Sequence, residues 1–192
     1  MIFATVGSQE PFDRLIRAVD EWGKLHARTD IFAQIGSSDF RPKFVDFTKF
    51  LNPSQFNNVM QRAKVIVAHA GMGSIISALE LGKPIVVMPR HGALRETRND
   101  HQVATAKRFG AQGRVVVAQD EHDFAAKLDY ALTLPETDRI DPEASPRLIA
   151  TIRAFLDNDL SELDPAISLG RFESTDARSA AVSLAAFRTR KA

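Results

Sequence analysis

A histidine and two glycines that follow an apolar run are the residues of this sequence with the clearest chemical use. Val65 to Ala68 is a short apolar run, rich in β-branched residues, as in a strand buried on both faces, and His69-Ala70-Gly71-Met72-Gly73-Ser74 follows it. The glycines allow a sharp turn with uncovered N–H groups, and a helix is expected over Ile75 to Leu81 with Ser74 as its N-cap. A helix N-terminus behind a glycine turn favours phosphate. The spacing therefore predicts a phosphate-binding turn.

The turn belongs to a longer strand-turn-helix-strand unit. Gly82 is suited to end the helix, and a second buried strand is expected over Ile85 to Met88, closed by Pro89. A glycine-rich turn after a strand is common in α/β proteins, so taken alone it is a weak sign of phosphate binding. Other positions are ambiguous in the same way: His69 suits a packed strand end, and Glu80 suits an exposed helix face.

A second turn of interest follows the first expected strand, Ile2 to Val6. Gly7-Ser8 leads from this strand into a helix expected over Phe12 to His26. In a parallel sheet such a turn lies at the carboxyl ends of the strands, where ligands collect. As a motif it is weak when taken alone.

The order of these residues resembles the donor-binding C-terminal domain of family 28 glycosyltransferases. The resemblance is carried by His-Ala-Gly-x-Gly-Ser, then Glu80, Gly-Lys-Pro, Pro89-Arg90 and Asn99-Asp100-His101-Gln102. Within that family the sequence is most similar to PssE-type subunits of exopolysaccharide glycosyltransferases, and to the soluble catalytic subunit of the two-chain dolichol-pathway UDP-N-acetylglucosamine transferase. The opening MIFATVGSQEPFDRLIRAVDEW also resembles the PssE type. The likeness runs from Met1 to roughly Leu132.

The resemblance implies a role for each matching residue. Gly71, Gly73 and Ser74 would bind the donor diphosphate, Glu80 would accept hydrogen bonds from the ribose, and Asn99 and Gln102 would meet the sugar and phosphates. No metal and no cofactor are expected, because the helix N-terminus can meet the charge of the leaving diphosphate. The expected nucleotide-sugar site comprises Gly7, Ser8, His69, Ala70, Gly71, Gly73, Ser74, Glu80, Arg90, Asn99 and Gln102.

The activity that the resemblance implies is that of a hexosyltransferase subunit. The chain would be the catalytic, donor-binding subunit of a two-subunit enzyme that moves glucuronic acid or N-acetylglucosamine from a UDP-sugar to a polyprenyl-linked acceptor. A membrane-anchored partner would supply the acceptor site, so the chain would be inactive alone. The sequence identifies no catalytic base; His91 and His101 are the nearest candidates. The alternative is a non-enzymatic regulatory or scaffolding subunit that keeps the fold and binds nucleotide.

Length, charge and cysteine content limit the number of domains and the kinds of partner that the chain is expected to have. The 192 residues suit one domain, expected over residues 1–159, followed by a flexible tail over 160–192 that is rich in Ser, Ala and charge. A formal charge of +1 gives no general attraction to nucleic acid. The absence of cysteine suits the cytoplasm, and no apolar run is long enough for a membrane span. We expect the chain to be cytoplasmic and to lie at the inner face of the membrane only through binding to its membrane-anchored partner.

Alternating strand and helix patterns predict an α/β fold: a Rossmann-like parallel sheet with helices on both faces, forming a single GT-B-type donor-binding domain. The phenylalanines between Phe40 and Phe56 exceed what their elements can bury, so they either fold over the core or form an exposed patch for a partner chain. Further strands are expected over Asp30–Gly36, Lys43–Phe50 at an edge, and Gly113–Ala118. Further helices are expected over Pro53–Ala63, Asn99–Phe109 before Gly110, Glu121–Leu132 and Pro146–Phe155.

Overall fold

The computed structural model describes residues 1–136 and 139–157 of the chain. These residues fall into two compact units, Met1–Pro142 and one that begins at Glu143. The first unit therefore ends before residue 159, the expected end of the domain, because the last described helix belongs to the second unit. The expected tail, residues 160–192, lies outside the described residues.

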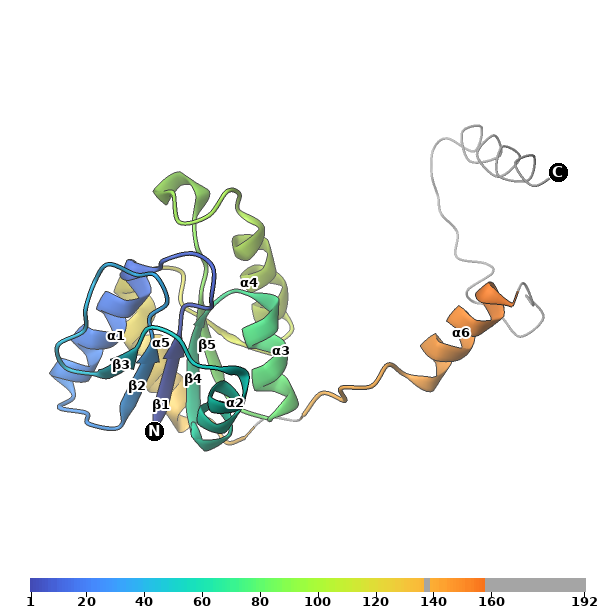
Figure 1. Ribbon diagram of the computed structural model, residues 1–192, viewed down its shortest axis with the longest axis horizontal. Helices are drawn as coiled ribbons and strands as arrows, with labels where there is room; N and C mark the ends of the chain where they lie inside the picture. Colours follow the sequence, from blue (N-terminus) through green and yellow to red (C-terminus); the bar gives the residue numbers. More distant parts are fainter. Residues whose placement is uncertain (137–138, 158–192) are drawn as a thin grey trace. The chain divides into compact units, whose positions relative to one another are not determined.

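A six-stranded, fully parallel sheet forms the centre of the first unit (Figure 1). Its strands are β1 (Ile2–Thr5), β2 (Ile31–Gln34), β3 (Asp46–Thr48), β4 (Val65–His69), β5 (Ile85–Met88) and β6 (Val116–Val117). Their order is β3-β2-β1-β4-β5-β6, so the direction of strand addition reverses between β1 and β4. This Rossmann-like order confirms the expected fold class, and ligands of such sheets bind at the point of reversal.

Helices cover both faces of the sheet, which explains why the central strands are apolar except at the carboxyl ends of β1 and β4. The first unit contains α1 (Asp13–Leu25), α2 (Pro53–Arg62), α3 (Met72–Glu80), the short 3-10 helix η1 (Gly92–Leu94), α4 (His101–Ala111) and α5 (Glu121–Thr133). One core joins α1 and α5 to one face, and a second core joins α2, α3 and α4 to the other. Alternate residues of one strand enter different cores, as Ile66 and Val67 of β4 do.

The segment between β2 and α2 is held to α1 by a buried carboxylate. Asp20 of α1 accepts hydrogen bonds from the backbone N–H groups of Lys43, at 3.0 Å, and Phe44, at 2.7 Å. Of the phenylalanines in this region, Phe40 and Phe56 pack against the two cores, whereas three others are exposed. The exposed three are Phe44, Phe47 and Phe50. Two of the five phenylalanines therefore fold over the core, and the other three leave exposed apolar surface.

Two helix boundaries differ from the sequence-based expectation. Gly71 is the N-cap of α3, so Ser74 is the third residue of the helix and not its cap. Gly110 lies within α4 and does not end it. A Cβ atom at Gly110 would lie 2.7 Å from the Val117 side chain, so glycine is needed here for close packing of α4 on β6 and not for termination.

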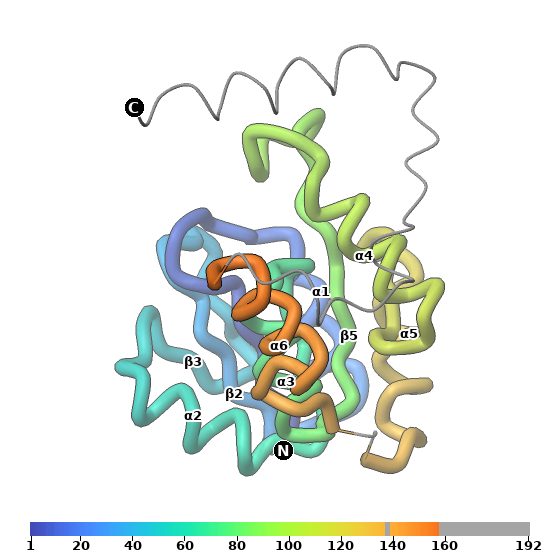
Figure 2. Tube along the Cα trace, turned by 90° about the vertical axis from the view of Figure 1, so that its right-hand side faces the viewer, coloured from blue at the N-terminus to red at the C-terminus, as the bar shows by residue number. Residues whose placement is uncertain are grey.

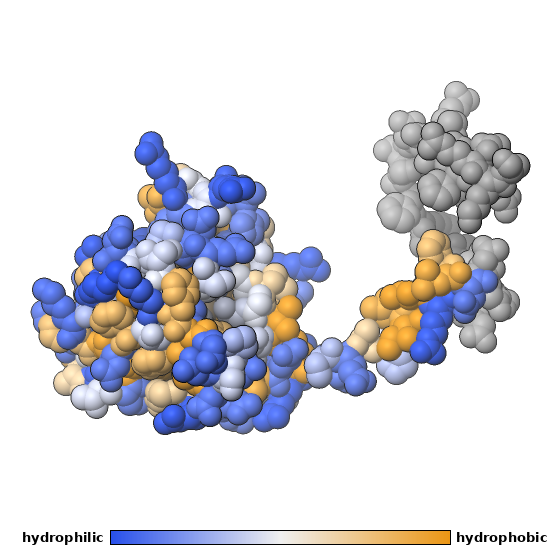
Figure 3. Space-filling view, in the orientation of Figure 1, coloured by the Kyte–Doolittle hydropathy of each residue, from blue (hydrophilic) through white to orange (hydrophobic). Residues whose placement is uncertain are grey.

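The described part of the second unit is dominated by α6 (Pro146–Leu156), which begins after Ser145 as N-cap. One stripe of this helix is apolar and exposed, as the adjacent orange and blue surfaces of α6 illustrate (Figure 3). The stripe consists of Leu148, Ile149, Ile152, Phe155 and Leu156. Within the described ranges, none of the helices has the length and apolar character that crossing a membrane requires.

Candidate functional site

A cavity of about 930 Å³ opens at the carboxyl ends of the strands, where the strand order reverses. Its walls come from the turns after β1 and β4, the start of α3, and the segment that joins β5 to α4. That segment extends beyond the ends of the strands in both Figure 1 and Figure 2. Of the predicted site residues, those that line the cavity are Gly7, Ser8, His69, Gly71, Gly73, Ser74, Arg90, Asn99 and Gln102.

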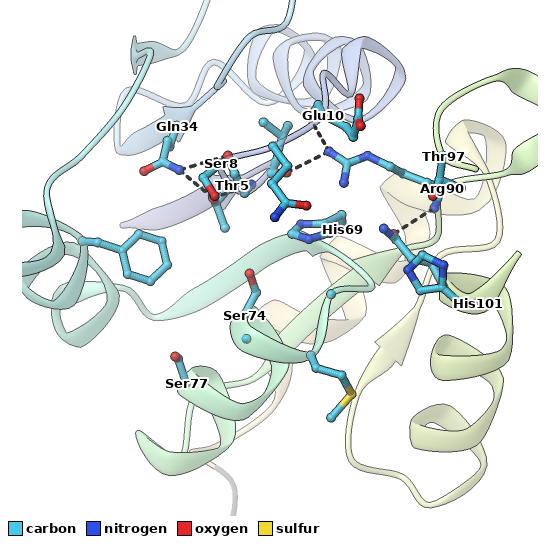
Figure 4. Close-up of a pocket in the computed structure, with 18 of the residues that line it drawn as sticks. Thr5, Ser8, Glu10, Gln34, His69, Ser74, Ser77, Arg90, Thr97 and His101 are labelled. Atoms are coloured by element: carbon cyan, nitrogen blue, oxygen red, sulfur yellow. Dashed lines mark hydrogen bonds between the residues drawn. The ribbon is translucent and has the colours of Figure 1, made fainter. Parts of the chain in front are cut away.

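The His69 ring lies between the two glycine turns (Figure 4). A Cβ atom added to Gly71 would lie 2.1 Å from His69 Nε2, and one added to Gly7 would lie 2.7 Å from Cε1. Both distances are far below contact distance, so only glycine lets the two backbones approach the ring. Gly7 also has a φ of +79°, in the left-handed region that glycine adopts readily.

His69 is uncharged at neutral pH. Burial lowers the pKa of His69 to about 4, and the positive charge of Arg90 adds to this effect. A contact of the ring with the backbone of Thr5 acts in the opposite direction but is outweighed by burial. The imidazole therefore supports the two turns, while positive charge in the cavity comes from other groups.

The N-terminus of α3 supplies uncovered donors at the cavity. The first helical hydrogen bond runs from Ile75 N to Gly71 O, at 3.2 Å, so the N–H groups of Met72, Gly73 and Ser74 have no acceptor within the helix. No side chain caps this end, and its first turn carries no acidic residue. A Cβ at Gly73 would meet nothing within 4 Å, so a ligand has open space beside it. This end of the helix can bind an anion.

Arg90 brings a buried positive charge to the same cavity. Its side chain is 4% exposed and donates from Nη2 to Val6 O, at 2.8 Å, and to Glu10 O, at 2.6 Å. Burial lowers the pKa of Arg90, against the effect of nearby carboxylates. Its Nε atom has no hydrogen-bond partner among the described residues. The guanidinium thus fixes the turn after β1 from the wall of the cavity.

Asn99 and Gln102 lie where α4 begins. Gln102 is buried, and its Oε1 accepts a hydrogen bond from Arg90 N at 3.2 Å. Asn99 is exposed, and its side chain contacts the ring of His101, which also lines the cavity. Gln102 therefore ties α4 to β5, and Asn99 stays accessible to a ligand.

Two predicted site residues do not line the cavity. Ala70 is buried in the core, where its 1% exposure leaves no surface for a ligand. Glu80 is the last residue of α3, about 9 Å further along the helix axis than Ser74, because each residue adds about 1.5 Å. Ser77 lines the cavity instead. The assignment of Glu80 to the site is thus wrong in its geometry: the six-residue separation turns it away from the face that carries Ser74.

Sequence reasoning also missed several residues that line the cavity. Glu10 lies on the turn after β1, and Thr97 and Arg98 lie directly before Asn99. Their neighbours in sequence were assigned to the site, so adjacency was the available signal. Gln34 and Phe56 come from the opposite wall, at the end of β2 and in α2, and no local motif marks them.

Together these groups favour an anionic ligand of nucleotide size. Three free N–H groups, the helix dipole and the guanidinium of Arg90 converge on a cavity of a volume that suits such a ligand. In the described part of the chain, no cluster of three or more His, Asp or Glu side chains has the proximity needed to hold a metal ion.

Comparison with known proteins identifies relatives of the chain. The model of the glycosyltransferase family 28 C-terminal domain matches residues 1–145. The UDP-N-acetylglucosamine transferase subunit ALG13 of Yarrowia lipolytica is 25% identical over 137 residues, which are 62% of this chain and 65% of that protein. Human ALG13 is 30% identical over 124 residues, which are 59% of this chain but 10% of that protein. The chain thus matches less than two thirds of the length of these relatives.

Solved structures share the fold at low sequence identity. The solution structure of ALG13 superposes with a TM-score of 0.51 at 18% identity, over 81% of this chain and 94% of that chain. The UDP-GlcNAc 2-epimerase of Methanocaldococcus jannaschii, in complex with UDP-GlcNAc and UDP, superposes with a TM-score of 0.53 at 12% identity, over 82% of this chain and 45% of that chain. Because the family model covers residues 1–145, the chain belongs to glycosyltransferase family 28 and carries its C-terminal domain.

Proposed function

We propose that this chain is the donor-binding, catalytic subunit of a two-subunit glycosyltransferase that transfers a sugar from a UDP-sugar to a polyprenyl-linked acceptor. The observation that carries the proposal is the cavity at the strand reversal, with the free N–H groups of α3 and the guanidinium of Arg90 on its walls. The family membership and the name of the ALG13 relatives, UDP-N-acetylglucosamine transferase subunits, support UDP-N-acetylglucosamine as the donor. Glucuronic acid is the second candidate for the sugar.

The proposed chemistry requires stabilisation of the departing diphosphate. When the glycosidic bond to the donor phosphate breaks, negative charge grows on the UDP oxygens. The N–H groups of Met72, Gly73 and Ser74 are fixed in position before the reaction, so they can stabilise this charge without reorganisation. Arg90 adds a positive charge in a site where burial strengthens its interactions. The proposal therefore needs no metal ion.

The partner subunit is the second part of the proposal. An acceptor hydroxyl must approach the sugar from the side of the cavity that this chain leaves open, and a membrane-anchored chain would bring a lipid-linked acceptor there. The apolar stripe of α6 suits contact with such a chain, because its residues recur at helical spacing on one face and are exposed. This arrangement would place the subunit at the membrane through its partner.

We expect the purified chain to bind UDP or a UDP-sugar in the presence of a chelator. The physical reason is that backbone donors and Arg90 neutralise the diphosphate without a divalent ion. Isothermal titration calorimetry with and without EDTA measures this, with ADP and GDP as controls for the base. Binding that requires added magnesium would contradict the metal-free site, and no response to any nucleotide would contradict the proposed function.

Within the proposed site, we expect the ribose to lie against Ser77 and not against Glu80. Ser77→Ala should weaken UDP binding by about 0.5–1.5 kcal/mol, the value of a neutral hydrogen bond. Glu80→Ala is the matched control on the same helix and should leave the affinity unchanged, because Glu80 does not line the cavity. Calorimetry on both folded variants measures the difference. Weaker UDP binding by Glu80→Ala, together with unchanged binding by Ser77→Ala, would show that Glu80 contacts the ligand and Ser77 does not.

We expect the isolated chain to bind donor without transferring sugar, and to transfer it once its membrane partner is present. Sugar transfer to lipid extracts is measured on membranes from cells that express each subunit alone or both together.

Ile152→Asp in α6 should abolish co-purification with the partner while UDP binding persists, because a charge enters the apolar stripe. Arg153→Ala, on the adjacent polar face, is the control. Transfer by the isolated chain would contradict the two-subunit proposal, and UDP binding without transfer in any combination would favour a regulatory subunit.

A further inference from the structure

An ion pair outside the cavity joins α1 to the segment between β5 and α4. Arg14 Nε donates to Glu96 Oε1 and Arg14 Nη2 donates to Glu96 Oε2, both at 2.8 Å. Both side chains are largely buried, at 13% and 14% exposure. This two-point geometry fixes orientation as well as distance. Neither residue lines the cavity.

The same two side chains hold the backbone of this segment at several points. Arg14 Nη2 also donates to Pro89 O at 3.0 Å, and Glu96 Oε2 accepts from His91 N at 3.0 Å. The start and the end of residues 89–96 are therefore both attached to the Arg14–Glu96 pair. A separate contact of Arg14 with Glu121 of α5, at 3.2 Å, lies at the more exposed side of the guanidinium.

The segment lacks an apolar anchor of its own. Each residue from 91 to 100 is exposed or half-buried, and Leu94 is 57% exposed. Little apolar surface is therefore buried here to hold the segment in place. Hydrogen bonds within the segment shape its turn, as from Glu96 N to His91 O at 3.2 Å, and the Arg14–Glu96 pair joins it to α1.

The residues directly after Glu96 form one wall of the cavity. Thr97, Arg98 and Asn99 line it, and Figure 4 draws Thr97 among the lining residues. Because Thr97 follows Glu96 directly, anchoring Glu96 also limits how far the start of this wall can move. Moving the wall changes its distance from any ligand that contacts the N-terminus of α3.

We propose that Arg14 and Glu96 are positioning residues, which hold the wall formed by residues 97–99 against the bound UDP-sugar. The proposal rests on the proposed function for the identity of the ligand, but the effect on the wall is independent of it. Neither residue touches the ligand. Their loss should therefore weaken binding through the path of the loop while the fold remains.

The test compares Glu96→Ala, Arg14→Lys and the reversed pair R14E/E96R in the full chain. Glu96→Ala should raise the Kd for the UDP-sugar roughly 3- to 10-fold, a fraction of what a charge-assisted pair contributes. Arg14→Lys should also weaken binding, since lysine keeps the charge but loses the two-point geometry. The reversed pair should recover part of the affinity. Glu121→Gln is the matched control, because it removes the charge from an Arg14 contact that does not reach the wall.

Amide hydrogen exchange of residues 97–99 in the ligand-free protein gives a second readout. Exchange there should become faster in Glu96→Ala and Arg14→Lys, and remain at the wild-type rate in Glu121→Gln. Wild-type exchange and wild-type Kd in both variants would overturn the positioning role. If the wild-type protein binds no UDP-sugar, the proposed function is contradicted. The hydrogen-exchange rates of residues 97–99 would still show whether Arg14 and Glu96 hold this wall.

Discussion

The contact of one imidazole with two glycine turns is the constraint on which the cavity depends. His69 ends β4, and its ring occupies space that a Cβ at Gly7 or Gly71 would fill. The ring thereby sets how closely the turn after β1 and the start of α3 approach each other. Since β1 and β4 are the neighbours at which the strand order reverses, this spacing also sets the width of the ligand site. Its low pKa, caused mainly by burial, keeps the ring neutral in this role.

Charge in the cavity is arranged around that neutral ring. Arg90 and Arg98 line the walls, the start of α3 adds the positive end of a helix dipole, and Glu10 supplies the carboxylate. The balance favours a ligand with more than one negative charge, as a nucleoside diphosphate has. Arg90 has a second function, because its hydrogen bonds to Val6 O and Glu10 O fix the turn that faces the ligand. One guanidinium thus both shapes the site and gives it charge.

The fold and the glycine-turn half of the site could be predicted because their signals are local. Apolar runs mark β1, β4 and β5, and the order from His69 to Ser74 marks the turn before α3. Glu80 was misplaced because its assignment followed the order of the family motif and not the helical spacing: six residues after Ser74, it lies about 120° around α3 from that side chain. Gln34 and the Arg14–Glu96 pair could not be predicted, since they join segments far apart in the sequence.

Mapping the ligand onto the chain by NMR is the most direct test of the central claim, that the cavity at the strand reversal is the UDP-sugar site. Amide shifts would be recorded on the labelled chain during titration with UDP-N-acetylglucosamine. The account predicts that the largest shifts fall on Gly7, Ser8, residues 71–77 and residues 97–102. Shifts confined to the separate groove beside β6, around Arg114 and Val115, would contradict it.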